Sequence, residues 1–175
     1  VMGGLRPYCA WMRRRISRPA RTLRQPSSQP PFGTESMWPP TSSAASDAPR
    51  TGALLLGRLA REGAHVVVTD LDEAGARRVA NKTTADAGPA RPLALRLDVT
   101  SEASVEAAVA ATVDAYGGLD VVVSNAGIAH AAAIDRMALA DWERSFAVNA
   151  TGHFLVARAA LRVLKAQGLG GSLVF

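Results

Sequence analysis

From residue 51 onward, short apolar segments alternate with longer segments in which apolar residues recur every three or four positions. The short segments are predicted to be strands at residues 65–70, 92–97, 119–123 and 172–175. The longer segments are predicted to be helices at residues 51–63, 72–88 and 102–118, with a long helix within 139–167. Strands that are apolar on both faces and alternate with amphipathic helices indicate a parallel sheet covered on both sides. The predicted fold class is therefore α/β, with a doubly wound parallel sheet.

Residues that favour helix ends support these boundaries. Gly63 stands just past the end of the first helix, where glycine adopts the left-handed conformation without strain. Asp72 and Ser101 stand where an N-cap residue is expected for the second and third helices. The helical periodicity also places Trp142 and Phe146 one turn apart, and we expect both rings to pack into the core.

Residues 1–50 have a different character from the rest of the chain. They hold eight of the ten prolines and seven serines, and they show no apolar period of a helix or a strand. We predict a disordered, basic leader over 1–50 and a partial dinucleotide-binding domain over 51–175. The composition of the leader is shared with organelle transit peptides, but a non-native leader, from a wrong start or a frameshift, is the favoured interpretation.

The positive charge of the chain lies in the leader. Residues 1–50 contain eight arginines and two acids, whereas residues 51–175 contain twelve basic and thirteen acidic residues. A basic groove for nucleic acid is therefore not predicted in the folded part. Cys9 is the only cysteine, which excludes a disulfide within the chain and favours a reducing, cytoplasmic location. No apolar segment approaches the length of a membrane span.

Polar or small residues follow three successive predicted strands. In doubly wound sheets, ligands bind at the carboxyl ends of the strands. Asp70 ends the strand at 65–70, where a carboxylate can accept hydrogen bonds from the ribose hydroxyls of an adenosine and repel a 2′-phosphate. That favours NAD over NADP, although a solvated acid in a turn is the simpler interpretation of Asp70 alone.

The next two strand ends carry compatible residues. Asp98 and Val99 could receive an adenine amine and cover its ring, although Asp98 could equally be a residue at the entry to a helix. Asn125, Ala126 and Gly127 form a small-residue turn where backbone can lie close to a cofactor. The coincidence of three suitable strand ends indicates a nucleotide more strongly than any one of them.

These segments resemble the short-chain dehydrogenase/reductase family, which has a Rossmann-like fold. The resemblance rests on "DVVVSNAGIA", on "LDVT" before it and on "FAVNATGHF" after it, in the order and at the spacing of the family. It covers roughly residues 51–175, about seven-tenths of the chain. The segments "SNAGIA", "DWERSFAVNATGHFLVAR" and "RVLKAQGLGGSLVF" further resemble the dehydrogenase domain of bifunctional rhamnulose-phosphate aldolase/lactaldehyde dehydrogenase proteins.

The resemblance implies a role for each matching residue. Asp70 would bind the adenosine ribose, Asp98 and Val99 the adenine, and Asn125, Ala126 and Gly127 would line the ribose on the nicotinamide side. Asn149 would be the catalytic asparagine that holds a water in a proton relay where its helix opens. The family's chemistry is hydride transfer between NAD(P) and an alcohol or carbonyl substrate, and its members are often homo-oligomers.

The sequence departs from the family pattern at both ends. The family opens with an apolar strand and a Thr-Gly-x-x-x-Gly-x-Gly loop for the pyrophosphate, but only Gly52 occupies a loop glycine position here, and Arg50 replaces the middle glycine. The chain stops at Phe175, before the family's catalytic Ser and Tyr-x-x-x-Lys. We therefore expect an incomplete domain that is inactive alone.

Two other function classes are left open. The chain could be a non-catalytic product of a truncated or frameshifted gene, or less plausibly a methyltransferase with a similar sheet. The three histidines, His65, His130 and His153, lack the spacing of metal ligands, and no metal site is predicted.

Overall fold

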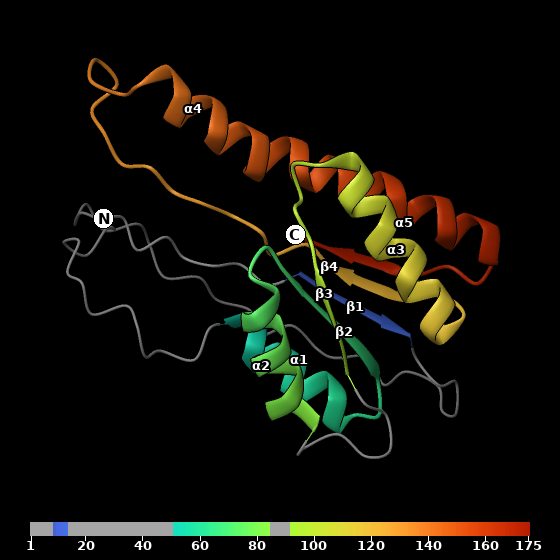
Figure 1. The fold of residues 1–175 in the computed structure, drawn as a ribbon. Coiled ribbons are helices and arrows are strands. Elements are labelled where there is room, and N and C mark those ends of the chain that lie inside the picture. Colours follow the sequence, from blue (N-terminus) through green and yellow to red (C-terminus); the bar gives the residue numbers. More distant parts are fainter. Residues whose placement is uncertain (1–8, 14–50, 85–91) are drawn as a thin grey trace, which may run out of the picture.

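The computed structural model describes residues 9–13, 51–84 and 92–175. Its elements, in chain order, are β1 (Cys9–Arg13), α1 (Thr51–Arg61), β2 (His65–Asp70), α2 (Glu73–Thr84), β3 (Leu93–Arg96), α3 (Glu102–Tyr116), β4 (Val121–Val123), α4 (Leu139–Phe146), the π-helix η1 (Ala147–Gly152), α5 (His153–Gln167) and β5 (Ser172–Val174). Figure 1 shows α4, η1 and α5 as one long rod beside α3. In the described ranges, no helix combines the length and the apolar character needed to cross a bilayer.

The strands form one five-stranded sheet in the order β3-β2-β1-β4-β5. β2 pairs with β3 in parallel, and β4 pairs with β5 in parallel. Since β1 is antiparallel to both β2 and β4, these two strands also run in the same direction. The predicted strands at 65–70, 92–97, 119–123 and 172–175 are confirmed as four parallel strands, each slightly shorter than or equal to its predicted range.

The strand β1 corrects the expectation that no strand precedes residue 51. Cys9–Arg13 lies at the centre of the sheet, paired with five residues of β2 and three of β4. Five residues are too few to show a strand period in an arginine-rich sequence. The two neighbouring strands nevertheless present backbone N–H and C=O groups that need partners, and β1 supplies them. The predicted disorder of the other leader residues lies outside the described residues.

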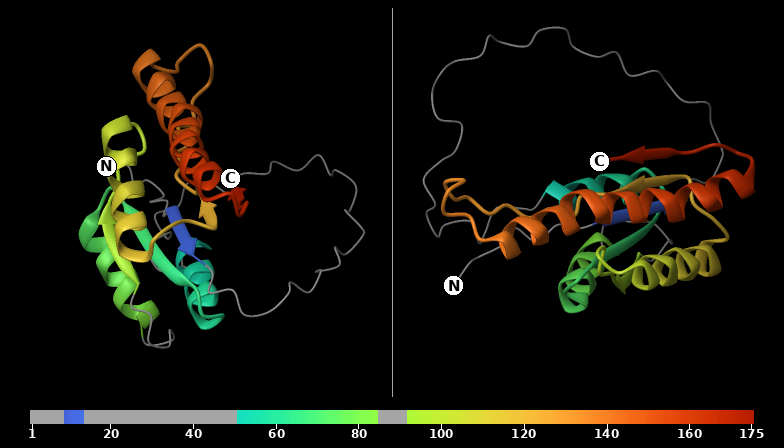
Figure 2. Two further views of the ribbon diagram at one scale, coloured as in Figure 1. Left: turned by 90° about the vertical axis from the view of Figure 1, so that its right-hand side faces the viewer. Right: turned by 90° about the horizontal axis from the view of Figure 1, so that it is seen from above.

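Alternate residues of β2 face opposite layers. Val66 and Val68 are buried against α1 and α2, in a cluster that contains Leu56. Val67 points to the other face, into a cluster with Val156 and other residues of α3 and α5. Helices therefore cover both faces of the sheet, as Figures 1 and 2 show. This arrangement confirms the doubly wound prediction.

The long predicted helix is interrupted by the π-helical turn Ala147–Gly152. Trp142 and Phe146, expected in the core, are 45% and 52% exposed and stack on each other with ring centroids 4.6 Å apart. The prediction of burial is wrong because the i, i+4 spacing makes two residues neighbours without saying which face of the helix meets the sheet. Ser101 is the predicted cap of α3, and its hydroxyl accepts from the Ser104 amide at 3.3 Å.

Two glycines should respond in opposite ways to substitution by alanine. A Cβ at Gly57, inside α1, would meet nothing within 4 Å, so Gly57→Ala should raise the free energy of unfolding by about 0.5–1 kcal/mol. A Cβ at Gly171 would lie 2.7 Å from the Asp120 carbonyl oxygen, so Gly171→Ala should lower the free energy of unfolding by about 1–3 kcal/mol. Urea unfolding measures both changes, and equal effects would contradict the packing of β5 against the loop before β4.

Candidate functional site

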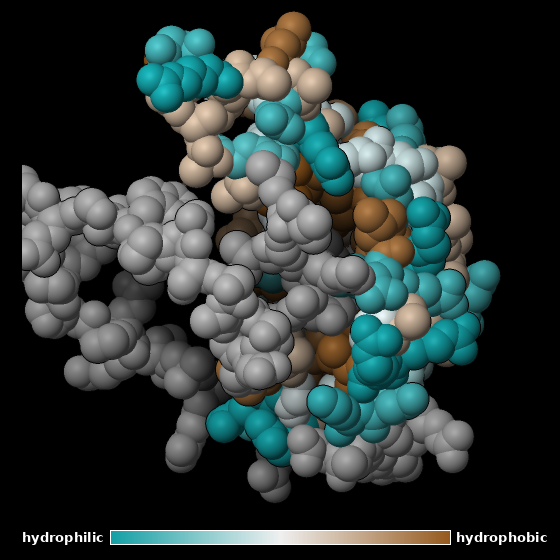
Figure 3. All heavy atoms as spheres, turned by 60° about the vertical axis from the view of Figure 1, so that its left-hand side comes forward, coloured by the Kyte–Doolittle hydropathy of each residue, from teal (hydrophilic) through white to brown (hydrophobic). Residues whose placement is uncertain are grey.

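A hollow lies at the carboxyl ends of β2, β3 and β4, facing α4 and the π-helix. It contains about 550 Å³ of empty space, including the part open to solvent. Its walls come from four segments, residues 69–71, 97–100, 126 and 128, and 144 and 148. Figure 3 shows hydrophobic side chains set back between hydrophilic ones on one face of the molecule.

Asp70 closes the β2 side of the hollow. The residue is only 5% exposed, and one oxygen of its carboxylate accepts from the Asp72 amide at 2.8 Å. Its backbone carbonyl accepts from the Leu97 amide at 2.9 Å, which joins the end of β2 to the end of β3. A buried carboxylate is costly unless it is hydrogen-bonded, so these bonds hold Asp70 at the wall in a defined orientation.

Asp98 is fixed by the turn that leads from β3 into α3. Its Oδ1 accepts from the backbone amide of Thr100 at 3.0 Å and from the Thr100 hydroxyl at 2.6 Å. Its own amide donates to the Ser104 hydroxyl at 3.0 Å. Beside it, Val99 packs directly on Gly152 of the π-helix, where an added Cβ would lie 2.9 Å from the valine Cγ2. The apolar wall of Val99 therefore depends on a glycine in the helix opposite.

The turn after β4 is bound to the π-helix by Asn149. The side-chain Oδ1 of Asn149 accepts from the Ile128 amide at 2.9 Å, and its Nδ2 donates to the Ile128 carbonyl at 2.8 Å. Ala126, 6% exposed, lines the hollow next to this contact. A Cβ at Gly127 would lie 3.5 Å from the Asn149 Oδ1, an ordinary contact, so the protein's own packing does not require a glycine there.

The structure brings most of the predicted site residues together. Four of them line the same hollow: Asp70, Asp98, Val99 and Ala126. Gly127 and Asn149 border it through their contacts with the Ile128 segment. Asn125 is exposed and does not line the hollow, and Gly52 lies in the first turn of α1, outside it.

Sequence reasoning missed the wall that α4 and the π-helix contribute. Arg144 and Val148 face the hollow together, and Arg144 brings a positive charge to a site that already holds two carboxylates. Their i, i+4 spacing places them on one side of a helix, but nothing in the sequence says that this side meets the strand ends. Leu71, Thr100 and Ile128 complete the lining and could have been found as neighbours of the predicted residues.

Tyr116 lies at the opposite edge of the sheet. Its ring stacks on His65, the first residue of β2, at a centroid distance of 5.0 Å. Burial raises the pKa of its phenol, and a hydrogen bond with the Leu93 backbone partly opposes that shift. Because His65 begins β2 and the hollow lies where β2 ends, Tyr116 is too far along the strand to act in the hollow. Among the described residues, no group of three or more His, Cys, Asp or Glu side chains could hold a metal ion.

Comparison with known proteins identifies relatives of the chain. A family model described as enoyl-(acyl carrier protein) reductase matches residues 54–175. The uncharacterized oxidoreductase YuxG of Bacillus subtilis is 42% identical over 124 residues, which cover 71% of this chain and 18% of YuxG. The sorbitol-6-phosphate 2-dehydrogenase of Escherichia coli is 37% identical over 123 residues, which cover 70% of this chain and 48% of that protein.

Solved structures agree with the fold. The crystal structure of sorbitol-6-phosphate 2-dehydrogenase SrlD from Erwinia amylovora matches with a TM-score of 0.67 and 38% identity, covering 70% of this chain and 48% of that one. A short-chain type dehydrogenase/reductase from Mycobacterium marinum matches with a TM-score of 0.67 and 33% identity, covering 70% and 47%. The chain thus spans about half the length of these solved relatives. From its sequence, its sheet and these matches, the chain belongs to the short-chain dehydrogenase/reductase family.

Proposed function

We propose that the hollow binds the adenosine half of NAD, as part of an oxidoreductase that transfers hydride between nicotinamide and an alcohol or carbonyl substrate. The observation that carries this proposal is the joint lining of one hollow by Asp70, Asp98 and Ala126, which follow three successive parallel strands. Membership of a family whose relatives are dehydrogenases supports the same chemistry. A bound nicotinamide ring would supply the hydride acceptor or donor.

The chemistry of the walls fits an adenosine. The apolar side chains of Leu71, Val99 and Val148 offer van der Waals contact to a flat ring, and the carboxylates offer acceptors to hydroxyl and amino groups. Asp70 would accept from the ribose hydroxyls, and its charge would repel a 2′-phosphate, which favours NAD over NADP. Asn125 and Gly127 would approach the ribose on the nicotinamide side, and Gly52 the pyrophosphate.

Asn149 is the proposed catalytic residue within these 175 residues. The π-helical turn that carries it departs from the regular i, i+4 pattern of backbone hydrogen bonds, a feature frequent at functional sites. Its amide binds Ile128 on the protein side, and we propose that the opened turn holds a water for proton transfer. The family's catalytic Ser and Tyr-x-x-x-Lys are not among these residues, so we expect binding without turnover from this chain alone.

The substrate we propose is a small polyhydroxylated molecule. The E. coli and E. amylovora relatives are named for sorbitol 6-phosphate, a polyol phosphate. The matched segment is only 18% of YuxG, so that relative carries much sequence beyond a domain of this kind. Such a length is compatible with the bifunctional aldolase/lactaldehyde dehydrogenase proteins that the sequence resembles. The lone cysteine and the balanced charge of residues 51–175 support a cytoplasmic enzyme that binds no nucleic acid.

The charge of Asp70 provides the direct test of cofactor choice. Asp70→Asn keeps an oxygen that can accept from the Asp72 amide but removes the negative charge. A hydrogen bond to a charged group contributes about 1.5–3 kcal/mol, so the variant should bind NAD at least about tenfold more weakly. Its affinity for NADP should not fall, because the repulsion of the 2′-phosphate is lost. Calorimetric titration with both dinucleotides measures these changes.

Glu73→Gln is the matched control for Asp70→Asn. Glu73 is an exposed acid three residues away that pairs with Arg77 at 2.6 Å, so its neutralisation should leave both affinities unchanged. Absence of NAD binding by the unmodified chain would refute the binding proposal and favour a non-catalytic gene product. Tighter binding of S-adenosylmethionine than of NAD would instead point to a methyltransferase.

We further propose that the chain pairs with a second copy through the exposed side of α4 and α5. Trp142, Phe146 and Phe154 are 45%, 52% and 57% exposed on this continuous rod. Apolar side chains gathered on one surface are typical of protein interfaces. Phe146→Glu combined with Phe154→Glu should convert a dimer into a monomer in light scattering, whereas Glu143→Gln should not. A monomeric unmodified chain would contradict this proposal.

A further inference from the structure

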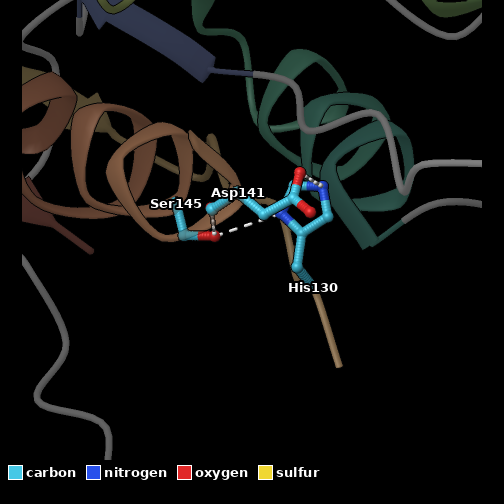
Figure 4. A network of polar contacts seen from close by, with 3 residues as sticks. All are labelled: His130, Asp141 and Ser145. Atoms are coloured by element: carbon cyan, nitrogen blue, oxygen red, sulfur yellow. Dashed lines mark hydrogen bonds and ion pairs between the residues drawn. The ribbon is translucent and has the colours of Figure 1, made fainter. Parts of the chain in front are cut away.

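The segment between β4 and α4 has no regular secondary structure from Ser124 to Ala133, yet it forms part of the hollow. Its first attachment to the helix is the pair of hydrogen bonds between Ile128 and Asn149. A second attachment lies two residues further on, where His130 reaches the helix α4 (Figure 4). The histidine side chain is only 14% exposed, so this contact is largely shielded from water.

The direction of the hydrogen bonds around Ser145 defines the state of His130. The Ser145 hydroxyl donates to the Asp141 carbonyl oxygen at 2.8 Å, one helical turn earlier. With its proton used in this way, the Ser145 oxygen accepts at 3.1 Å from the Nδ1 of His130, which must therefore carry a hydrogen. The other ring nitrogen, Nε2, faces the Asp141 Oδ1 at 3.8 Å, beyond hydrogen-bond distance.

This contact joins two walls of the hollow. On one side, His130 follows Ile128, a lining residue. On the other, Ser145 stands next to Arg144, which lines the hollow with Val148. The distance across the hollow between the turn after β4 and the helix is therefore set at two points near the carboxyl end of α4, by Ser145 within it and by Asn149 just after it.

We propose that His130 is a positioning residue that, through its Nδ1–H and Ser145, holds Arg144 and Val148 opposite Ala126 and Ile128 at the width required by the nucleotide. This inference rests on the proposed NAD-binding function. His130 does not touch the adenosine in this arrangement, because its ring is directed at Ser145 and Asp141 (Figure 4). Loosening of the contact should lower affinity by letting α4 move away from the strand ends.

The test uses three substitutions at one position. His130→Ala removes the donor and should weaken NAD binding by about fivefold, the loss expected for one hydrogen bond. His130→Asn places an N–H at the same distance from the backbone as Nδ1 and should restore the affinity of the unmodified chain. His130→Gln places its N–H one bond further away and should not restore it. Circular dichroism melting of each variant checks that the chain still folds.

A matched control separates the hydrogen bond from the nearby charge. Asp141→Asn keeps the carbonyl oxygen that accepts from Ser145 and changes only the group 3.8 Å from Nε2, so it should leave NAD affinity within about twofold. Ser145→Ala, which removes the acceptor, should match His130→Ala. In nitrogen-15 spectra of the ligand-free chain, His130 should show the Nδ1–H tautomer.

The outcomes distinguish the two proposals. Where the unmodified chain binds NAD and His130→Ala binds it equally well, the positioning role is refuted and the binding function stands. A neutral His130 that carries its hydrogen on Nε2 would also refute the positioning role. If the unmodified chain binds no NAD, both proposals are refuted, whether or not His130 shows the Nδ1–H tautomer.

Discussion

Two side-chain amides hold the long helix against the strand β4, and the rest of the site depends on them. Asn149 bonds the backbone N–H and C=O of Ile128 at 2.9 and 2.8 Å, and Gln167 bonds those of Leu119 at 2.8 and 2.6 Å. Each amide thus bonds both the N–H and the C=O of one backbone residue, as a neighbouring strand would. Asn149 and Gln167 are eighteen residues apart, about 27 Å along a helix, so they attach the helix to the β4 segment at two widely separated points.

The π-helical turn lies at the first of these two attachment points. A π-turn inserts one residue into a helix, which rotates the residues before it relative to those after it. Leu155, Val156 and Ala159 of α5 remain packed in the core, while the turn before them presents Asn149 to Ile128. Gly152 closes the same turn against Val99, where no side chain would fit. One irregularity therefore joins the ends of β3 and β4 to the helix that closes the hollow.

The sequence was sufficient to predict structural features that repeat with a period. It was insufficient to predict features that depend on how a helix is oriented against the sheet. Apolar segments and cap residues such as Ser101 predicted the four parallel strands and the helices. The strand ends predicted Asp70, Asp98 and Ala126, because parallel strands bring their carboxyl ends to one edge. The exposure of Trp142 and the contribution of Arg144 depend on how a helix is rotated about its axis, which spacing alone does not define.

The direction of β1 decides which of its ends lies at the edge of the sheet that carries the hollow. Because β1 is antiparallel to β2 and Cys9 pairs with Thr69, the amino end of β1 lies at the edge that carries the hollow. A parallel strand there, as the family pattern has it, would deliver its carboxyl end and a glycine loop to this edge. α1 ends near the start of β2, so its first turn, with Gly52, points toward the same edge. The first turn of α1 is thus near this edge, but the chain leaves β1 at the opposite edge. The central strand and the first turn of α1, which the family pattern joins by one glycine loop, are therefore not directly joined in this chain.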